Sequence, residues 1–246
     1  MMSSQKYSWK AILSYFFLAT SISLIFRTYT PGWLDFLKLP YGFGLNLLVG
    51  SGPLLAAVCF RFLLKKEITV KKLPLFGTSV WKSIAFVVAP ILVLTVIGIV
   101  NDKGLNLHVL GLKTGLLWLV YIYGEEFGWR GYLQQILPEK PFVNSFVIGI
   151  IWYLWHLSFI FDGYNLSKEL IFLLVLITGS YIALLITKRT QSLLTAVAFH
   201  ISFSVMTNIP FTTGYLYGVI TMLMVWAVLL LFWKSKPLKP LNSIFI

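Results

Sequence analysis

The sequence predicts an all-α polytopic membrane protein with about eight transmembrane helices and both termini in the cytoplasm. Of its 246 residues, 58% are hydrophobic and only 11% are charged, less than half the charged share of an ordinary soluble domain. A soluble globule cannot cover its surface with so few charges, and the high apolar content excludes a disordered chain. The apolar residues also form runs long enough to cross a bilayer core of about 30 Å.

Eight such runs follow one another along the chain, with Pro, Gly or Lys recurring in the short segments between them. They cover residues 9–26, 42–64, 80–100, 114–133, 142–161, 169–187, 192–208 and 213–233. Because a spanning helix needs about 20 residues, these runs occupy most of the chain and leave no room for a separate soluble domain. We therefore expect residues 1–246 to form a single membrane domain.

The basic residues predict the orientation of this domain. Eight spans place both termini on one side, and that side receives 15 of the 20 Lys and Arg residues. Since positively charged loops stay in the cytoplasm, both termini are expected there. The net charge of +12 is then a topology signal and a contact with anionic membrane lipid. Without a clustered basic face, it predicts no nucleic-acid partner.

The fourth run is the one that carries several charges, at Glu125, Glu126 and Arg130. A charged side chain inside a membrane faces a cavity or a partner, because the lipid core cannot solvate it. Glu126 and Arg130 are four residues apart and share a helix face, so we predict that they form a structural ion pair. Glu125 points about 100° away from that face and has no cation on its own helix. It needs a partner from another helix.

Two of the three histidines, His156 and His200, also lie within predicted spans. A buried imidazole needs a hydrogen-bond partner, and at about 1.5 Å per residue both histidines fall within reach of the depth of Glu125. We therefore expect these three side chains to meet. His108 is expected in an external loop without a role, and Trp152 is expected to serve packing or interface anchoring.

A carboxylate and a histidine can together hold a water molecule and deprotonate it. A second histidine with a hydroxyl one turn later, here His200 and Ser204, can donate hydrogen bonds to a developing oxyanion. Together these groups predict attack of water on an amide without a covalent intermediate. One Glu and two His would also suit catalytic zinc, but the H-E-x-x-H spacing of zinc proteases is missing. We therefore favour a site without metal or other cofactor.

Three motifs of this region resemble those of the CAAX protease and bacteriocin-processing family, also called CPBP or Abi. The first is the sequence Glu-Glu-Phe-Gly-Trp-Arg-Gly-Tyr-Leu at residues 125–133. The second is Trp-x-x-Trp-His-Leu at residues 152–157, and the third is Ser-Leu-Leu-x-Ala-x-x-x-His at residues 192–200. The resemblance covers about residues 110–208, which we take as the catalytic core.

The resemblance implies an eight-helix bundle and a metal-independent glutamic intramembrane endopeptidase. By the family pattern, Glu125 and His156 activate water, while His200 and an Asn or Asp four residues later line the oxyanion hole. Here that later position is Ser204, which departs from the pattern. Asn208 lies about 6 Å further along the helix axis than Ser204, so it is a poor substitute and is expected to have a supporting role.

The eukaryotic branch of the family trims prenylated CaaX termini, and members in Gram-positive bacteria are implicated in self-protection against bacteriocins. The short chain with its many lysines looks bacterial, so we expect a plasma-membrane protease that acts in bacteriocin immunity or processing on a peptide or membrane-protein substrate. Two alternatives stay open, a non-catalytic immunity or binding protein and a zinc-dependent membrane protease. A transporter with a proton relay is disfavoured because the sequence contains no duplicated halves.

Overall fold

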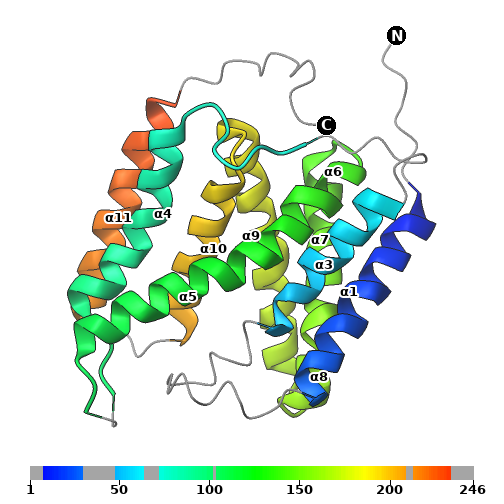
Figure 1. Ribbon diagram of the computed structural model, residues 1–246, viewed down its shortest axis with the longest axis horizontal. Coiled ribbons are helices and arrows are strands. Elements are labelled where there is room, and N and C mark those ends of the chain that lie inside the picture. The colour runs from blue at the N-terminus through cyan, green and yellow to red at the C-terminus, as the bar shows by residue number, and fades with distance from the viewer. Residues whose placement is uncertain (1–7, 30–47, 64–71, 102–103, 209–212, 234–246) are drawn as a thin grey trace.

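The computed structural model describes residues 8–29, 48–63, 72–101, 104–208 and 213–233 (Figure 1). Its helices are α1 (Trp9–Tyr29), α3 (Ser51–Leu63), α4 (Val80–Ile97), α5 (Leu107–Gly128), the π-helix η3 (Trp129–Leu133), α6 (Gln134–Ile136), α7 (Pro141–His156), α8 (Ser158–Phe161), α9 (Leu166–Thr190), α10 (Leu193–Asn208) and α11 (Thr213–Leu231). No strand occurs in these ranges, and the all-α prediction is confirmed.

Each predicted apolar run overlaps one of the longer helices. Six helical segments among the described residues are long and apolar enough to cross a membrane, and two shorter apolar helices lie at Ser51–Arg61 and Leu193–Met206. The beginning of the predicted run 42–64 lies outside the described residues. The chain is therefore a multi-pass membrane protein, as the sequence predicted.

One helix begins earlier than the sequence suggested. The side-chain oxygen of Asn106 accepts hydrogen bonds from the backbone N–H groups of His108 and Val109, both at 3.1 Å. This N-cap starts α5 at Leu107, because it satisfies backbone donors that the first helical turn leaves unpaired. The expectation that His108 lies in a loop is therefore wrong. The side chain is exposed, and its Nδ1 lies 2.9 Å from the carbonyl oxygen of Thr95.

The long helices alternate in direction through the bundle (Figure 1). The first residue of α1 and the last residue of α11 accordingly lie at the same end. This arrangement agrees with the predicted placement of both termini on one side of the membrane. The distribution of Lys and Arg in the sequence predicts that this is the cytoplasmic side.

Helix α5 crosses the bundle obliquely (Figure 1), and its residues contribute to two hydrophobic cores. Trp118 and Ile122, in its first part, pack in one core with residues of α4, α10 and α11. Trp129 and Tyr132, in its continuation, pack in the other core with residues of α1, α3 and α7. The two glutamates lie where α5 passes from one core to the other, and both halves of the bundle therefore contribute to their surroundings.

The helix widens into a π-helix at Trp129–Leu133, a feature that the sequence analysis did not anticipate. Two side chains bond backbone carbonyls of this widened turn. Arg61 Nη2 donates to the carbonyl oxygen of Gly131 at 2.6 Å, and Gln135 Nε2 donates to that of Arg130 at 3.0 Å. Single π-turns inside α-helices are frequent at functional sites, and this one follows directly after Glu125 and Glu126.

Gly128 allows the helix to reach this position. A Cβ atom added there would collide with Pro53 of α3 and with the hydroxyl of Tyr15 on α1. A larger residue would therefore push α5 away from the two helices that support the π-turn.

Candidate active site

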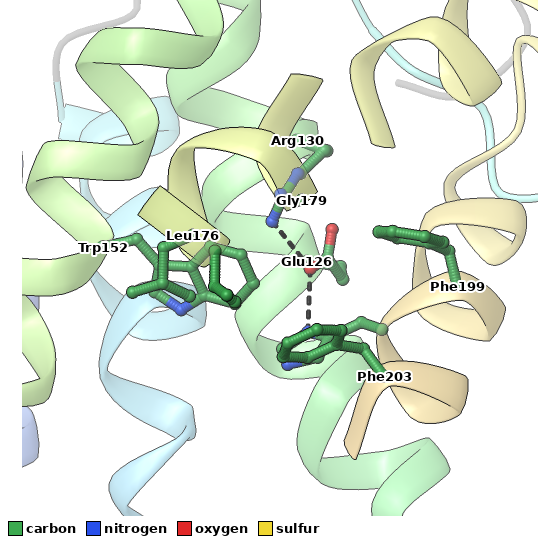
Figure 2. Close-up of a pocket in the computed structure, with 9 residues that line it drawn as sticks. Glu126, Arg130, Trp152, Leu176, Gly179, Phe199 and Phe203 are labelled. Carbon is green, nitrogen blue, oxygen red and sulfur yellow. Dashed lines mark hydrogen bonds and ion pairs between the residues drawn. The ribbon is translucent and has the colours of Figure 1, made fainter. Parts of the chain in front are cut away.

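Glu126 joins two cationic or potentially cationic side chains inside the bundle (Figure 2). Its Oε1 lies 2.7 Å from Arg130 Nη1 and 2.9 Å from His200 Nδ1. The predicted Glu126–Arg130 pair is thus confirmed, and His200 is a partner that the sequence did not assign to it. Because an ionised carboxylate only accepts hydrogen bonds, Nδ1 of His200 is the donor.

The guanidinium of Arg130 is enclosed by helices α7 and α9. It lies over the ring of Trp152 at 4.7 Å, and Nη2 is 3.4 Å from Ser180 Oγ. Arg130 is 1% exposed and Glu126 is fully buried. A buried ion pair tolerates the loss of one partner poorly, because the other charge is left without compensation. This pair therefore fixes α5 against α7, α9 and α10.

Glu125 has a different set of neighbours, all of them uncharged donors. Its Oε2 accepts from the indole N–H of Trp152 at 3.1 Å and from that of Trp129 at 3.4 Å. Tyr121 is close enough to this carboxyl group to interact with it electrostatically. The carboxyl group is buried and forms no ion pair among the described residues. As expected, its partner from another helix is needed, and Trp152 of α7 supplies it.

His156 is the last residue of α7, and its tautomer follows from its hydrogen bond. Nδ1 lies 2.8 Å from the carbonyl oxygen of Trp152, which can only accept, so Nδ1 carries the proton. In the neutral ring, Nε2 then has its lone pair available as a proton acceptor. Glu125 is close enough to interact electrostatically with this imidazole.

The end of α7 is held by a cation from α1. Leu157 adopts a left-handed conformation with φ 54° and ends the helix. Arg27 Nη1 donates to the freed carbonyl oxygen of His156 at 2.7 Å, and its guanidinium lies over the ring of Phe161 at 4.9 Å. Arg27 thus positions the backbone that carries His156. Sequence analysis missed it because the contact spans 129 residues.

Trp152 stands at the centre of the site. The centroid of its indole ring lies 4.9 Å from that of the His200 ring, with the two rings nearly perpendicular, and 6.0 Å from that of the His156 ring. Its indole N–H donates a hydrogen bond to Glu125. The prediction that Trp152 serves packing or interface anchoring was incomplete, because it did not include the hydrogen bond to Glu125. Glu125, His156 and His200 therefore gather around one indole, although the direct hydrogen-bond partner of His200 is Glu126 rather than Glu125.

A narrow pocket opens beside the charged group, between α9 and α10 (Figure 2). Its walls are formed by Glu126, Arg130, Trp152, Val175, Leu176, Gly179, Phe199, His200 and Phe203. The free volume is about 10 Å³, about what a single water molecule requires. Oε2 of Glu126 has no hydrogen-bond partner among the described residues, so this pocket offers a water molecule a carboxylate oxygen.

The remaining predicted residues lie on α10. Ser204 follows His200 by one turn, is partly buried and takes part in a polar or ring interaction. Asn208 is the last residue of the helix, and its side chain lies outside the described part of the structure. Among the described residues, no group of three His, Cys, Asp or Glu side chains is arranged to hold a metal ion.

The helical fold and the carboxylate–histidine centre define the class of the protein, a polytopic membrane protein with a cluster of charged and polar side chains inside the bundle. In the comparison with protein families, residues 107–206 match the model described as type II CAAX prenyl endopeptidase, Rce1-like. This segment contains Glu125, His156, His200 and Ser204, and it confirms the resemblance found in the motifs. The match supports a CAAX-type intramembrane protease. No curated protein and no solved structure matches the chain.

Proposed function

We propose that this protein is an intramembrane endopeptidase in which Glu125 and His156 activate the attacking water without a metal ion. The observation that carries the proposal is the hydrogen bond of His156, which determines which ring nitrogen holds the proton. Its Nδ1 proton is committed to the carbonyl of Trp152, so Nε2 can accept a proton. Glu125, held by uncharged indole donors, adds a carboxylate whose negative charge is not cancelled by an ion pair.

In this mechanism the water oxygen attacks the carbonyl carbon of the scissile peptide bond. The water proton passes to Glu125 or His156, and the C–N bond then breaks as that proton is returned to the leaving amine. One water molecule is consumed, and a carboxylic acid and an amine are formed. Because every proton that is taken up is given back, the two side chains end the cycle in their starting state.

His200 and Ser204 are the proposed donors to the tetrahedral oxyanion. Since Nδ1 of His200 bonds Glu126, a donor at Nε2 requires the doubly protonated ring. Arg130 shares the carboxylate oxygen of Glu126 that His200 contacts. Glu126 and Arg130 are then positioning residues, because they act through His200.

A zinc site built from Glu125, His156 and His200 is the competing mechanism, and one feature argues against it. The guanidinium of Arg130 lies against Trp152 and Glu126 within this group of side chains. A fixed positive charge there would repel a divalent cation in a poorly screened interior. We therefore expect activity of the purified protein to survive strong chelation, and elemental analysis to find no zinc at one per chain.

We also propose that the enzyme resides in a bacterial plasma membrane and acts in bacteriocin immunity or processing on a peptide or membrane-protein substrate. The distribution of Lys and Arg supports an orientation with both termini in the cytoplasm, and the family resemblance supports the location and the role. A non-catalytic immunity protein is the second candidate, because the buried Glu126–Arg130–His200 group would hold four helices together even without turnover.

The decisive experiment compares wild type with Glu125→Gln and with Asp162→Asn, which removes an exposed carboxylate. Cleavage of a membrane-peptide library in nanodiscs is followed by mass spectrometry, and protection of cells is measured in parallel. Loss of an acid–base residue typically lowers the rate by about 10²–10⁴-fold, so Glu125→Gln should be inactive in both assays while Asp162→Asn behaves as wild type. If Glu125→Gln still protects cells fully, the protein acts as a binder.

A further inference from the structure

A carboxylate outside the candidate active site is buried where α7, α8 and α9 meet, at the end of the bundle opposite the first residue of α1 (Figure 1). Glu169, in the first turn of α9, is only 7% exposed. It forms no ion pair among the described residues, and it takes no part in the proposed activation of water. Its burial therefore needs another explanation.

The position of Glu169 on α9 stabilises its negative charge. The first turn of an α-helix has unpaired N–H groups and a partial positive charge, so a carboxylate is favourable there. Asn165 caps this end of α9, where its side-chain oxygen accepts a hydrogen bond from the backbone N–H of Lys168 at 3.1 Å. Glu169 can therefore accept hydrogen bonds as a carboxylate without an ion-pair partner.

Both side-chain hydrogen bonds of Glu169 come from residues that flank His156 in the sequence. Oε2 accepts from the hydroxyl groups of Tyr153 and Ser158, each at 2.8 Å. Tyr153 belongs to the last turn of α7, and Ser158 begins α8. One carboxylate oxygen on α9 thus ties together the two segments that meet at His156.

The backbone between these two segments is strained. Leu157 has φ 54° and ψ 28°, a left-handed conformation that a leucine rarely adopts. Such a conformation persists only where the surrounding contacts hold it. Arg27 supplies one contact through the carbonyl oxygen of His156, and Glu169 supplies two more from α9.

The last turn of α7 also determines how the His156 ring is held. Nδ1 bonds the carbonyl oxygen of Trp152, one turn earlier, so this bond requires that the last turn stays helical. The ring of Phe172, three residues after Glu169, lies nearly perpendicular to the imidazole with 4.9 Å between centroids. Helix ends fray when nothing holds them. The bonds to Glu169 therefore stabilise the turn on which the tautomer of His156 depends.

Building on the proposed protease function, we propose that Glu169 is a positioning residue for His156. By holding Tyr153 and Ser158, it keeps the imidazole with Nδ1 protonated and Nε2 available to accept a proton from water. Glu169 affects the reaction only through His156.

The test observes the His156 ring directly, because the chain contains only three histidines. The full-length protein is labelled with ¹⁵N in the imidazole rings, and NMR spectra in detergent are recorded at about pH 8, above the ordinary imidazole pKa of about 6.5. Protonated and unprotonated ring nitrogens have well-separated ¹⁵N shifts, so the spectra distinguish the two tautomers. The His156→Gln variant assigns the signals of His156.

We expect the wild-type spectrum to show His156 with Nδ1 protonated, and Glu169→Leu to show a mixture of both tautomers. In peptide cleavage, Glu169→Leu should lower kcat about a hundredfold, as a misplacement of about 1 Å does, and leave KM unchanged. Glu169→Gln keeps an amide oxygen that can accept both hydroxyl bonds. It should therefore retain the wild-type tautomer and most of the activity.

A matched pair of tyrosine variants separates positioning from general loosening of the fold. Tyr153→Phe removes a bond to Glu169, whereas Tyr215→Phe removes a buried hydroxyl on α11 that bonds the carbonyl of Gly98. Only Tyr153→Phe should alter the His156 spectrum. If Glu169→Leu does not fold, the double variant Tyr153→Phe with Ser158→Ala takes its place, and thermal unfolding shows which variants are folded.

An unchanged His156 spectrum in folded Glu169→Leu or in the double variant overturns the positioning role, and so does an equal change in Tyr215→Phe. If the wild-type protein cleaves peptides in that case, the protease function stands without this role. A change of tautomer in Glu169→Leu, together with no cleavage of any peptide by the wild type, supports the positioning of His156 and counts against the protease function.

Discussion

Glu125 and Glu126 are neighbours in the sequence, yet they occupy two different regions of the molecule. Glu126 faces α9 and α10, where it is paired with Arg130 and His200. Glu125 faces α7 and is held by two indole N–H groups. The approximately 100° rotation between successive helical residues thus places one carboxylate in a charged network and the other among neutral donors.

The comparison teaches that identical side chains acquire different capacities from their partners. In the Glu126 region the negative charge is matched by a buried guanidinium, so the group mainly stabilises the packing of four helices. In the Glu125 region no charge is matched, and a histidine with an available Nε2 lies nearby. We therefore propose that Glu126 stabilises the packing of the helices whereas Glu125 takes part in catalysis, and the following substitutions test this division.

The largest effect is expected for Glu126→Gln. This substitution leaves Arg130 buried without its counter-charge, which typically costs about 3–5 kcal/mol. Glu125→Gln, the matched change in the other region, removes no ion pair and should cost about 1 kcal/mol, as a single net hydrogen bond does. Thermal or denaturant unfolding of both variants in detergent measures the difference.

A double variant, Glu126→Gln with Arg130→Met, serves as the control for the first prediction. Removing the unpaired guanidinium of Arg130 should restore a large part of the lost stability, because replacing a buried ion pair by uncharged groups often changes the stability little. Equal stability of Glu126→Gln and Glu125→Gln would contradict the division between the two regions.

An intermediate effect is expected for Trp152→Phe, which removes one donor from Glu125. A hydrogen bond to a charged group contributes about 1.5–3 kcal/mol, whereas one between neutral groups contributes about 1 kcal/mol. Trp155→Phe is the matched control, because its indole donates to the neutral hydroxyl of Ser23 at 2.9 Å. Unfolding measurements should show the larger loss for Trp152→Phe, and peptide cleavage should fall only in that variant. A larger loss of stability in Trp155→Phe than in Trp152→Phe would indicate that Glu125 is not the catalytic carboxylate.

The smallest effect is expected for Ser204→Ala. Loss of a well-placed oxyanion donor costs about a hundredfold or more, and a short hydroxyl with a single donor should cost less, about tenfold in kcat/KM. Ser204→Asn, which offers two donors on a longer side chain, should preserve or raise turnover. Ser202→Ala provides the control, since its hydroxyl donates to the carbonyl of Ala198 within the same helix. Unchanged activity in Ser204→Ala would remove this residue from the oxyanion site.

Some features of the site followed directly from spacing along one helix. The Glu126–Arg130 pair was predicted because an α-helix places residues four apart on the same face, whatever the rest of the protein does. The absence of an in-helix cation for Glu125 followed in the same way. The location of His156 and His200 inside the helical bundle, where both are partly buried, followed from the apolar runs around them.

Other features depended on contacts between helices and were missed or incomplete. Trp152 was expected to pack, yet its N–H bonds Glu125. His200 was expected to meet Glu125, yet it bonds Glu126. Both contacts depend on the rotation and the axial offset of one helix relative to another, and no pattern within a single helix encodes these.

The sequence by itself determined that this protein is a helical membrane bundle, where most of its helices lie, and which polar side chains are buried. These properties depend on apolar run length, on the 3.6-residue period and on the cost of charge in lipid, all of which are local. The tertiary structure alone decided the rest. It decided which histidine each glutamate faces, that Arg27 caps α7, and that α5 widens into a π-turn, because close packing among several helices fixes these contacts together.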